Sequence, residues 1–386
     1  MKKVTALYLG FLLLMMALSN NGYSLTLNSN ISGGYDSNPS TLADKFNPEA
    51  STFIRIRAVI NQKISSNIKA KISVNSRQYN SDGENADTNR SKLSLKYKDT
   101  IGKKMRSKLI LSANIGTFDK TYVSHTTGNI GTFSEQDISD RYDYQWWSTS
   151  ASLSKKITKR LTANFGSEIL LRDYEDYDIA GLSNFDYRQL TFSTRWHYRF
   201  SKAHRSILNM GLSKREYDDK RELTLTGATI ENSDLMYTHQ KLSLSHRYKV
   251  TRHLTLEGTA SYFSQQDSGQ GYYDYIRLAS QLAIRYRVLP LSNIQLKIDY
   301  RRDDYERANA QNNNTQDEED TLSTREGRTV SLRFESKFPF KALLGKRPTK
   351  SYPTLYAQWQ NKSIEANDAN YTYDRQQVQA GILFHF

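Results

Sequence analysis

The chain has 386 residues, a formal net charge of +14 and no cysteine, which excludes a disulfide scaffold and thiolate metal sites. Its mean hydropathy of −0.71 is that of a soluble or disordered protein. The 26 tyrosines and 15 phenylalanines argue against disorder, because disordered chains are poor in aromatic residues. A wall of strands with one apolar and one polar face reconciles these observations, since only alternate residues must then be apolar.

Residues 1–24 carry the features of a secretory signal peptide. Two lysines precede a short apolar run, and Gly22 and Ser24 stand at the −3 and −1 spacing of a cleavage site. We expect cleavage after Ser24, which removes the two lysines and leaves a charge of +12. No later segment has about 20 consecutive apolar residues, so no transmembrane helix is expected.

Residues 25–386 alternate between apolar and polar side chains in about sixteen segments. In one of them, Ile54 and Ile56 are interleaved with Arg55 and Arg57. A soluble sheet protein shares such alternation, but no dry core tolerates lysine and arginine on strand after strand. We therefore predict an all-β fold, a transmembrane antiparallel β-barrel of about 16 strands with short periplasmic turns and long extracellular loops. The long loops are expected near 38–49, 80–89, 118–140, 174–186, 218–233, 265–273, 304–327 and 362–371.

If the apolar residues face lipid, the opposite faces line the barrel interior and are strongly basic. The acidic residues expected there are few: Glu168, Glu257, Asp299 and Glu335. Two interpretations are open: a solvated wall with local ion pairs, or a surface that selects anions. Because the basic residues recur on many strands, we expect a positive field around the whole wall. The predicted lining comprises Arg55, Arg57, Lys69, Lys71, Lys92, Lys96, Arg195, Lys241, Arg247, Arg277, Arg285, Arg287, Lys297, Arg301 and Arg333.

Aromatic residues share the interior faces near the outer rim. Tyr142, Tyr144 and Trp146 are spaced along one predicted strand, and Tyr371 and Tyr373 begin the last one. Flat rings at these positions could stack on sugar faces. The alternative is that they form the upper aromatic girdle or pack against loops.

The sequence predicts no enzyme, no cofactor and no metal site. Seven histidines are present, and His125 lies in a long loop near Asp119 and Asp137, but no histidine–nucleophile motif occurs. The expected partners are outer-membrane lipid, lipopolysaccharide and the barrel-insertion machinery. Nucleic acid is not expected, because the chain carries an export signal.

Two motifs resemble known outer-membrane proteins. The chain ends in an alternating strand whose last residue, Phe386, resembles the signal read by the barrel-insertion machinery. The segment Gly33-Gly34-Tyr35-Asp36-Ser37-Asn38-Pro39 resembles the opening strand of a broad family of Gram-negative β-barrel porins, several encoded with exopolysaccharide export systems. From the residues alone, this segment is simply the exit of the first strand into a turn.

The resemblance and the basic lining together suggest an outer-membrane pore that exports an acidic exopolysaccharide, with periplasmic export components as partners. A diffusion porin for small anions and a non-conducting structural barrel are the alternatives. The loop at 118–140 separates the first two: folded inward it would make a porin constriction, and folded outward it would leave a polymer exit.

Overall fold

A computed structural model describes residues 25–80, 86–102, 107–123, 130–133, 135–179, 182–306, 324–338 and 353–385. The expected signal peptide and Phe386 lie outside these ranges. None of the helices in the described ranges is long and apolar enough to cross a membrane.

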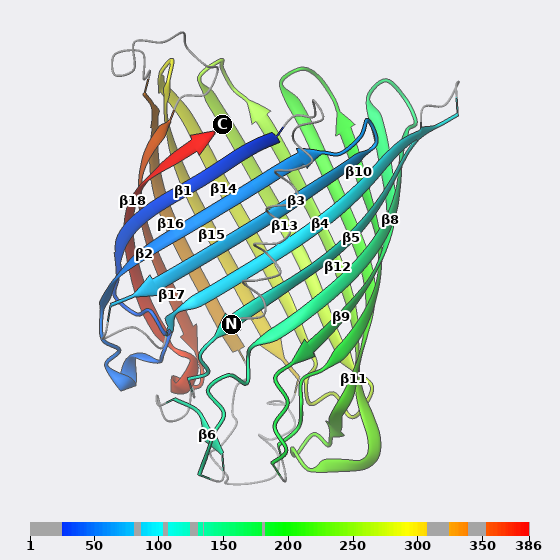
Figure 1. Cartoon of the computed structure of the whole chain (residues 1–386), viewed down its shortest axis with the longest axis vertical. Coiled ribbons are helices and arrows are strands. Elements are labelled where there is room, and N and C mark those ends of the chain that lie inside the picture. The colour runs from blue at the N-terminus through cyan, green and yellow to red at the C-terminus, as the bar shows by residue number, and fades with distance from the viewer. Residues whose placement is uncertain are drawn as a thin grey trace.

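Sixteen strands form a closed antiparallel barrel, as predicted (Figure 1). Each strand pairs with its sequence neighbour in the wall, and the first strand pairs with the last. The strands are β1 (Leu25–Asp36), β2 (Ser51–Lys63), β3 (Ile68–Tyr79), β4 (Thr88–Ile101), β5 (Ser107–Lys120), β8 (Tyr144–Lys156), β9 (Leu161–Tyr174), β10 (Tyr187–Arg199), β11 (His204–Leu223), β12 (Thr229–Lys249), β13 (Leu254–Asp267), β14 (Tyr275–Leu289), β15 (Ser292–Tyr305), β16 (Thr324–Lys337), β17 (Thr354–Ala366) and β18 (Tyr373–His385).

The other described elements lie in the loops. β6 (Thr132–Phe133) and β7 (Gln136–Asp137) pair as a small separate sheet, and two 3-10 turns, η1 (Asp44–Phe46) and η3 (Ala369–Tyr371), stand in the first and last long loops.

The outer face of the wall is apolar and exposed. Ile54, Phe192 and Leu212 are 61%, 57% and 58% exposed, and similar side chains repeat on nearly every strand. An apolar surface that surrounds a whole molecule needs hydrocarbon around it. A closed barrel meets the other demand of hydrocarbon, because each backbone N–H and C=O of the wall is bonded to a neighbouring strand. The barrel therefore spans a membrane.

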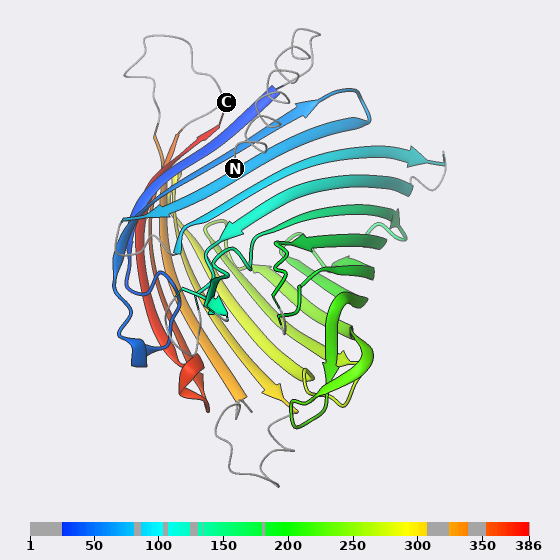
Figure 2. The same cartoon turned by 60° about the horizontal axis from the view of Figure 1, so that its bottom comes forward.

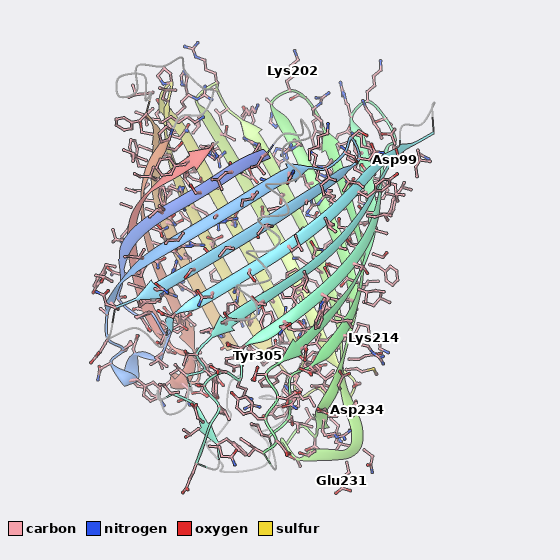
Figure 3. The ribbon with its side chains drawn as sticks, in the orientation of Figure 1. Asp99, Lys202, Lys214, Glu231, Asp234 and Tyr305 are labelled. Atoms are coloured by element: carbon pink, nitrogen blue, oxygen red, sulfur yellow. The ribbon has the colours of Figure 1, made fainter. Side chains whose placement is uncertain are left out.

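The two ends of the barrel differ as the predicted loop lengths require. The long loops lie at the bottom of Figure 1, and the short turns lie at the top together with the longer β16–β17 connection, residues 338–353. Figure 3 places Lys202 at the turn end, and Glu231 and Asp234 near the tip of the β11–β12 hairpin at the loop end. This hairpin projects beyond the wall because β11 and β12 contain 20 and 21 residues. In outer-membrane barrels the short turns face the periplasm, which makes the loop end the extracellular one.

An ion pair joins the first and last strands. Asp36, the last residue of β1, is completely buried and accepts hydrogen bonds from Arg375 Nε of β18 at 2.8 Å and Tyr79 Oη at 2.8 Å. Gln377 Nε2 donates a further bond at 3.0 Å. Asp36 thus anchors the seam, whereas the sequence suggested only the start of a turn. The turn itself is present, since Asn38 Oδ1 accepts from the Leu42 N–H at 3.0 Å.

Glycines let the seam close tightly. A Cβ at Gly381 would lie 2.5 Å from the Ile31 carbonyl oxygen and 2.6 Å from Ser32 Cβ. The missing side chain also leaves room for Tyr356, which is opposite Gly381 in the register, to bond Asn30 at 3.1 Å. The inner side of the seam therefore depends on a residue without a side chain.

We expect Gly381→Ala to weaken barrel closure, because the new Cβ contacts backbone atoms that cannot move without breaking the β1–β18 pairing. Overpacking of this kind costs about 1–3 kcal/mol. The readout is the midpoint of urea unfolding in detergent, measured from the heat-modifiable gel mobility of the folded barrel. Gly33→Ala is the matched control, since its Cβ would lie 3.7 Å from the nearest atom. Equal midpoints for the two variants would contradict this account of the seam.

Candidate functional site: the inner wall and the extracellular mouth

The structure places every residue of the predicted basic lining on an inward-facing strand position. Arg55 and Arg57 alternate with the exposed Ile54 and Ile56, and the other members alternate with lipid-facing residues in the same way. Lys92 also faces inward, beside Trp146. The wall therefore carries a basic interior, but its cations are not all in the same electrostatic state.

Four basic residues of the predicted lining on β14–β16 are ion-paired. Arg277 and Arg301 both bind Asp303, at 2.7 Å and 2.6 Å, and Lys297 binds Asp299 at 2.9 Å. Arg333 binds Glu335 at 2.7 Å. Asp303 is completely buried beneath its two arginines. Six basic residues of the predicted lining lie on β14–β16 and share three interior acids, so the positive charge here is reduced but not cancelled, and a positive field around the whole wall stays a prediction.

The cations of β2–β4 have no acidic partner within 4.0 Å in the described ranges. We call this group the basic stripe. Its cations contact amides and aromatic rings: Arg55 Nε donates to Asn75 Oδ1 at 2.8 Å, and Arg77 lies 4.6 Å from the centre of the Phe53 ring. Such contacts hold the side chains without neutralising them. The basic stripe consists of Arg55, Arg57, Lys69, Lys71, Arg77, Arg90, Lys92 and Lys96.

Like charges face one another directly within the basic stripe. Arg55 is opposite Arg77, and Lys69 is opposite Lys63 on one side and Lys96 on the other. Like charges at directly opposite strand positions repel and destabilise a sheet. The arrangement requires water or an anion between the side chains. It extends from the loop end of the wall, at Arg77, to the turn end, at Lys69.

An aromatic collar lines the inside of the wall at its loop end. From Phe118 to Tyr305 consecutive rings, with His239 as one link, have centroids 5.1–6.4 Å apart. Figure 3 shows Tyr305 near the lower, loop end. Many of these rings are covered by one another and by arginines, so they stiffen the mouth. The collar comprises Phe53, Tyr79, Phe118, Tyr144, Tyr174, Tyr187, Tyr217, Tyr237, His239, Phe263, Tyr275, Tyr305 and Tyr373.

The predicted sugar-stacking residues occupy three different environments. Tyr144 and Trp146 lie on the inner wall, in one recess with Arg172. Tyr373 is 5% exposed and receives a hydrogen bond from Lys362, so its ring offers no free face. Tyr142 packs between loop residues, and Tyr371 ends η3 in the last long loop. The structure brings only the first two together.

The loop between β5 and β8 packs at the mouth. Tyr142 meets Tyr122 edge-on at 4.8 Å and stacks on Phe185 of the next long loop at 6.0 Å. Arg141 also bonds the Ser183 carbonyl oxygen at 3.2 Å. In Figure 1 the part of this loop carrying β6 lies below the ends of the wall strands, and in Figure 2 it lies over the opening. Its described residues therefore do not form a constriction at mid-height.

Lys220 of β11 lies inside this group of mouth residues. Its ammonium is 4.5 Å from the centre of the Tyr273 ring and 5.7 Å from that of Phe185. Burial, with Arg141 and Arg215 nearby, lowers the pKa of Lys220 to about 8. Sequence analysis missed this residue, because only the β11–β12 register shifts bring it inward.

Asp303 and Asp36 are buried in ion pairs inside the barrel, and the sequence analysis did not include them among the interior acids. Each sits on the inward parity of its strand, and Asp303 follows Arg301 by two residues, which was the available signal.

Comparison with known proteins is limited to structure: no protein-family model matches the chain, and no curated protein matches its sequence. An anion-selective porin from Comamonas acidovorans is similar over 94% of this chain and 99% of its own, with a TM-score of 0.47 and 12% identity. A bacterial polysaccharide outer membrane secretin is similar over 93% and 98%, with a TM-score of 0.48 and 7% identity. OccK2 from Pseudomonas aeruginosa is similar over 94% and 98%, with a TM-score of 0.43 and 10% identity.

The wall is closed by sixteen strands and its outer face is apolar. The fold is that of an outer-membrane β-barrel. At identities of 12% and below, the likeness to the solved barrels is one of architecture alone.

The mouth loops should become more ordered as the pH falls. Burial, reinforced by Asp119 and Asp140, raises the pKa of Asp143 from 3.8 to about 7, while its Oδ1 accepts the Lys120 N–H at 2.6 Å. Because the folded loop holds this proton more tightly than an unfolded one, its stability rises as pH falls from about 7 toward 4. Hydrogen exchange of residues 136–143, corrected for intrinsic rates, measures this. Asp143→Asn keeps the acceptor but should lose the pH dependence; an unchanged dependence would contradict the assignment.

Proposed function

We propose that this barrel is an outer-membrane pore for anions, and that its physiological substrate is an acidic exopolysaccharide. The observation that carries the proposal is the basic stripe, an unneutralised track from the loop end to the turn end of one wall. Basic walls favour anion passage. A small-anion filter needs such charges at a single level, whereas a polymer must be held weakly at every level and released as readily as it binds.

The position of the loop between β5 and β8 supports a polymer path. Its described residues stay at the extracellular end and leave the middle of the stripe open. The same loop also favours the second candidate, a diffusion porin for small anions, because it lies over the opening in Figure 2. The two candidates share the stripe and differ in the size of the solute.

Charge selectivity tests the shared part of the proposal. In planar bilayers with a salt gradient, the wild-type reversal potential should show anion preference. Replacing Arg57, Lys71, Lys92 and Lys96 by glutamine should remove most of that preference, since none of these charges has an acidic partner within 4.0 Å in the described ranges and only Glu168 lies in the same recess. Cation preference or the absence of conductance in the wild type would overturn the pore for anions.

The matched control lies on the opposite wall. The control variant carries Lys297→Gln, Asp299→Asn, Arg333→Gln and Glu335→Gln. These changes remove two ion pairs and leave the net charge unchanged. This variant should keep the wild-type reversal potential. A loss equal to that of the stripe variant would mean that selectivity does not come from the stripe.

Secretion tests the polymer. A strain lacking this gene should release less acidic polysaccharide, and complementation should succeed with the wild type and the paired-wall control but fail with the stripe variant. Surface levels of heat-modifiable barrel must be equal in the three complemented strains. Normal secretion in the deletion strain would reject export and leave the small-anion porin.

A further inference from the structure

Trp146 packs closely against the inner wall because residue 116 is glycine. A Cβ at Gly116 would lie 2.7 Å from Trp146 Nε1 and 2.8 Å from its Cε2, so the indole occupies the space of the missing side chain. The two residues are opposite each other in the β5–β8 register. The indole therefore packs against β5, and the Lys92 ammonium lies over its ring, 4.8 Å from the centre.

Trp146 does not belong to the aromatic collar. The collar rings pair with one another, whereas Trp146 pairs with no other ring within the described ranges. The Lys92 ammonium lies 4.8 Å from its ring centre. Trp147, the next residue, is 39% exposed on the lipid-facing side of the same strand. A girdle function therefore belongs to Trp147 and leaves Trp146 unexplained.

The recess around Trp146 has a volume of about 520 Å³ and lies on the basic stripe. Arg57 and Arg90 line it from the stripe side and Arg172 from the other, and Glu168 is its acidic member. Neutral hydrogen-bonding groups are also present, among them Asn75, which already accepts from Arg55. The recess thus combines a flat apolar surface, an excess of cations and hydrogen-bonding edges.

These three features match one class of ligand. A pyranose ring has an apolar face of C–H groups and a rim of hydroxyls, and an acidic sugar adds a carboxylate. We infer that the Trp146 recess is a stacking subsite for an acidic sugar unit. This inference rests on the proposed function of the pore. The C–H face stacks on the indole, Lys92 leaves the ring to pair with the carboxylate, and Arg57 or Arg172 holds a second oxygen.

Current blockade by a defined probe tests the subsite. Oligogalacturonate added to reconstituted single channels should block the wild type transiently. Trp146→Ala should shorten the dwell time by roughly five- to tenfold, the size of one lost aromatic contact. Gly116→Ala is not equivalent, because its Cβ would also lie 2.5 Å from the Ser91 carbonyl oxygen and would strain the β4–β5 pairing. Trp147→Phe is the matched control and should keep the wild-type dwell time.

Neutral and small probes define the ligand class. A maltooligosaccharide of the same chain length should block far more briefly, and monomeric gluconate should not give resolvable blocks. Equal blocking by the neutral oligosaccharide would overturn the assignment of an acidic sugar. Oligogalacturonate blocks that are unaffected by Trp146→Ala, in an anion-selective channel, would overturn the subsite and leave the pore intact.

A second readout keeps the subsite testable if the pore proposal fails. In detergent, a variant with Trp147, Trp196 and Trp359 changed to phenylalanine reports only Trp146 by its fluorescence. Oligogalacturonate should change this emission saturably and the maltooligosaccharide should not, whatever ion the channel prefers. No change with oligogalacturonate would reject the subsite.

Discussion

Every backbone N–H and C=O of the wall must find its partner in a neighbouring strand, because hydrocarbon offers none. This constraint requires closure, and closure requires that β1 and β18 meet in register. The pairing is secured from the inside by Asp36 and Arg375, and it is made close by Gly381. The lipid-facing apolar belt, the wet interior and the separation of turns from loops all follow once the cylinder is closed.

The interior shows two ways to keep a cation in a narrow space. On β14–β16, Asp303 binds two arginines and is itself fully buried, which fixes both side chains and reduces the local positive charge. On β2–β4, arginines and lysines face one another, so hydration or a mobile anion must supply the compensation. The barrel therefore has a structural side and an electrostatic side.

The fold was predictable from sequence because a period of two is a local property. The adjacent residues Ile54 and Arg55 indicate the lipid-facing and interior faces of their strand before any neighbouring strand is known. The lengths of the loops indicate which end of the barrel is extracellular. The separation of charge into a paired and an unpaired side was not predictable in the same way. It depends on which strand is adjacent to which and on the register, as in the pairing of Arg277 with Asp303. Trp146 was recognised as an interior ring, but its close packing depends on Gly116, a cross-strand partner from another part of the chain.

The ion pair at the seam also has a consequence for the order of assembly. Asp36 and Arg375 are 339 residues apart in sequence, while the other wall strands pair with neighbours a few residues away. Bringing the two ends together carries the largest loop-closure entropy of any pairing in the barrel, and it cannot occur before the final strand has been made. Until residue 375 reaches residue 36, the sheet has unpaired edges at β1 and β18, and hydrocarbon offers those edges no partner.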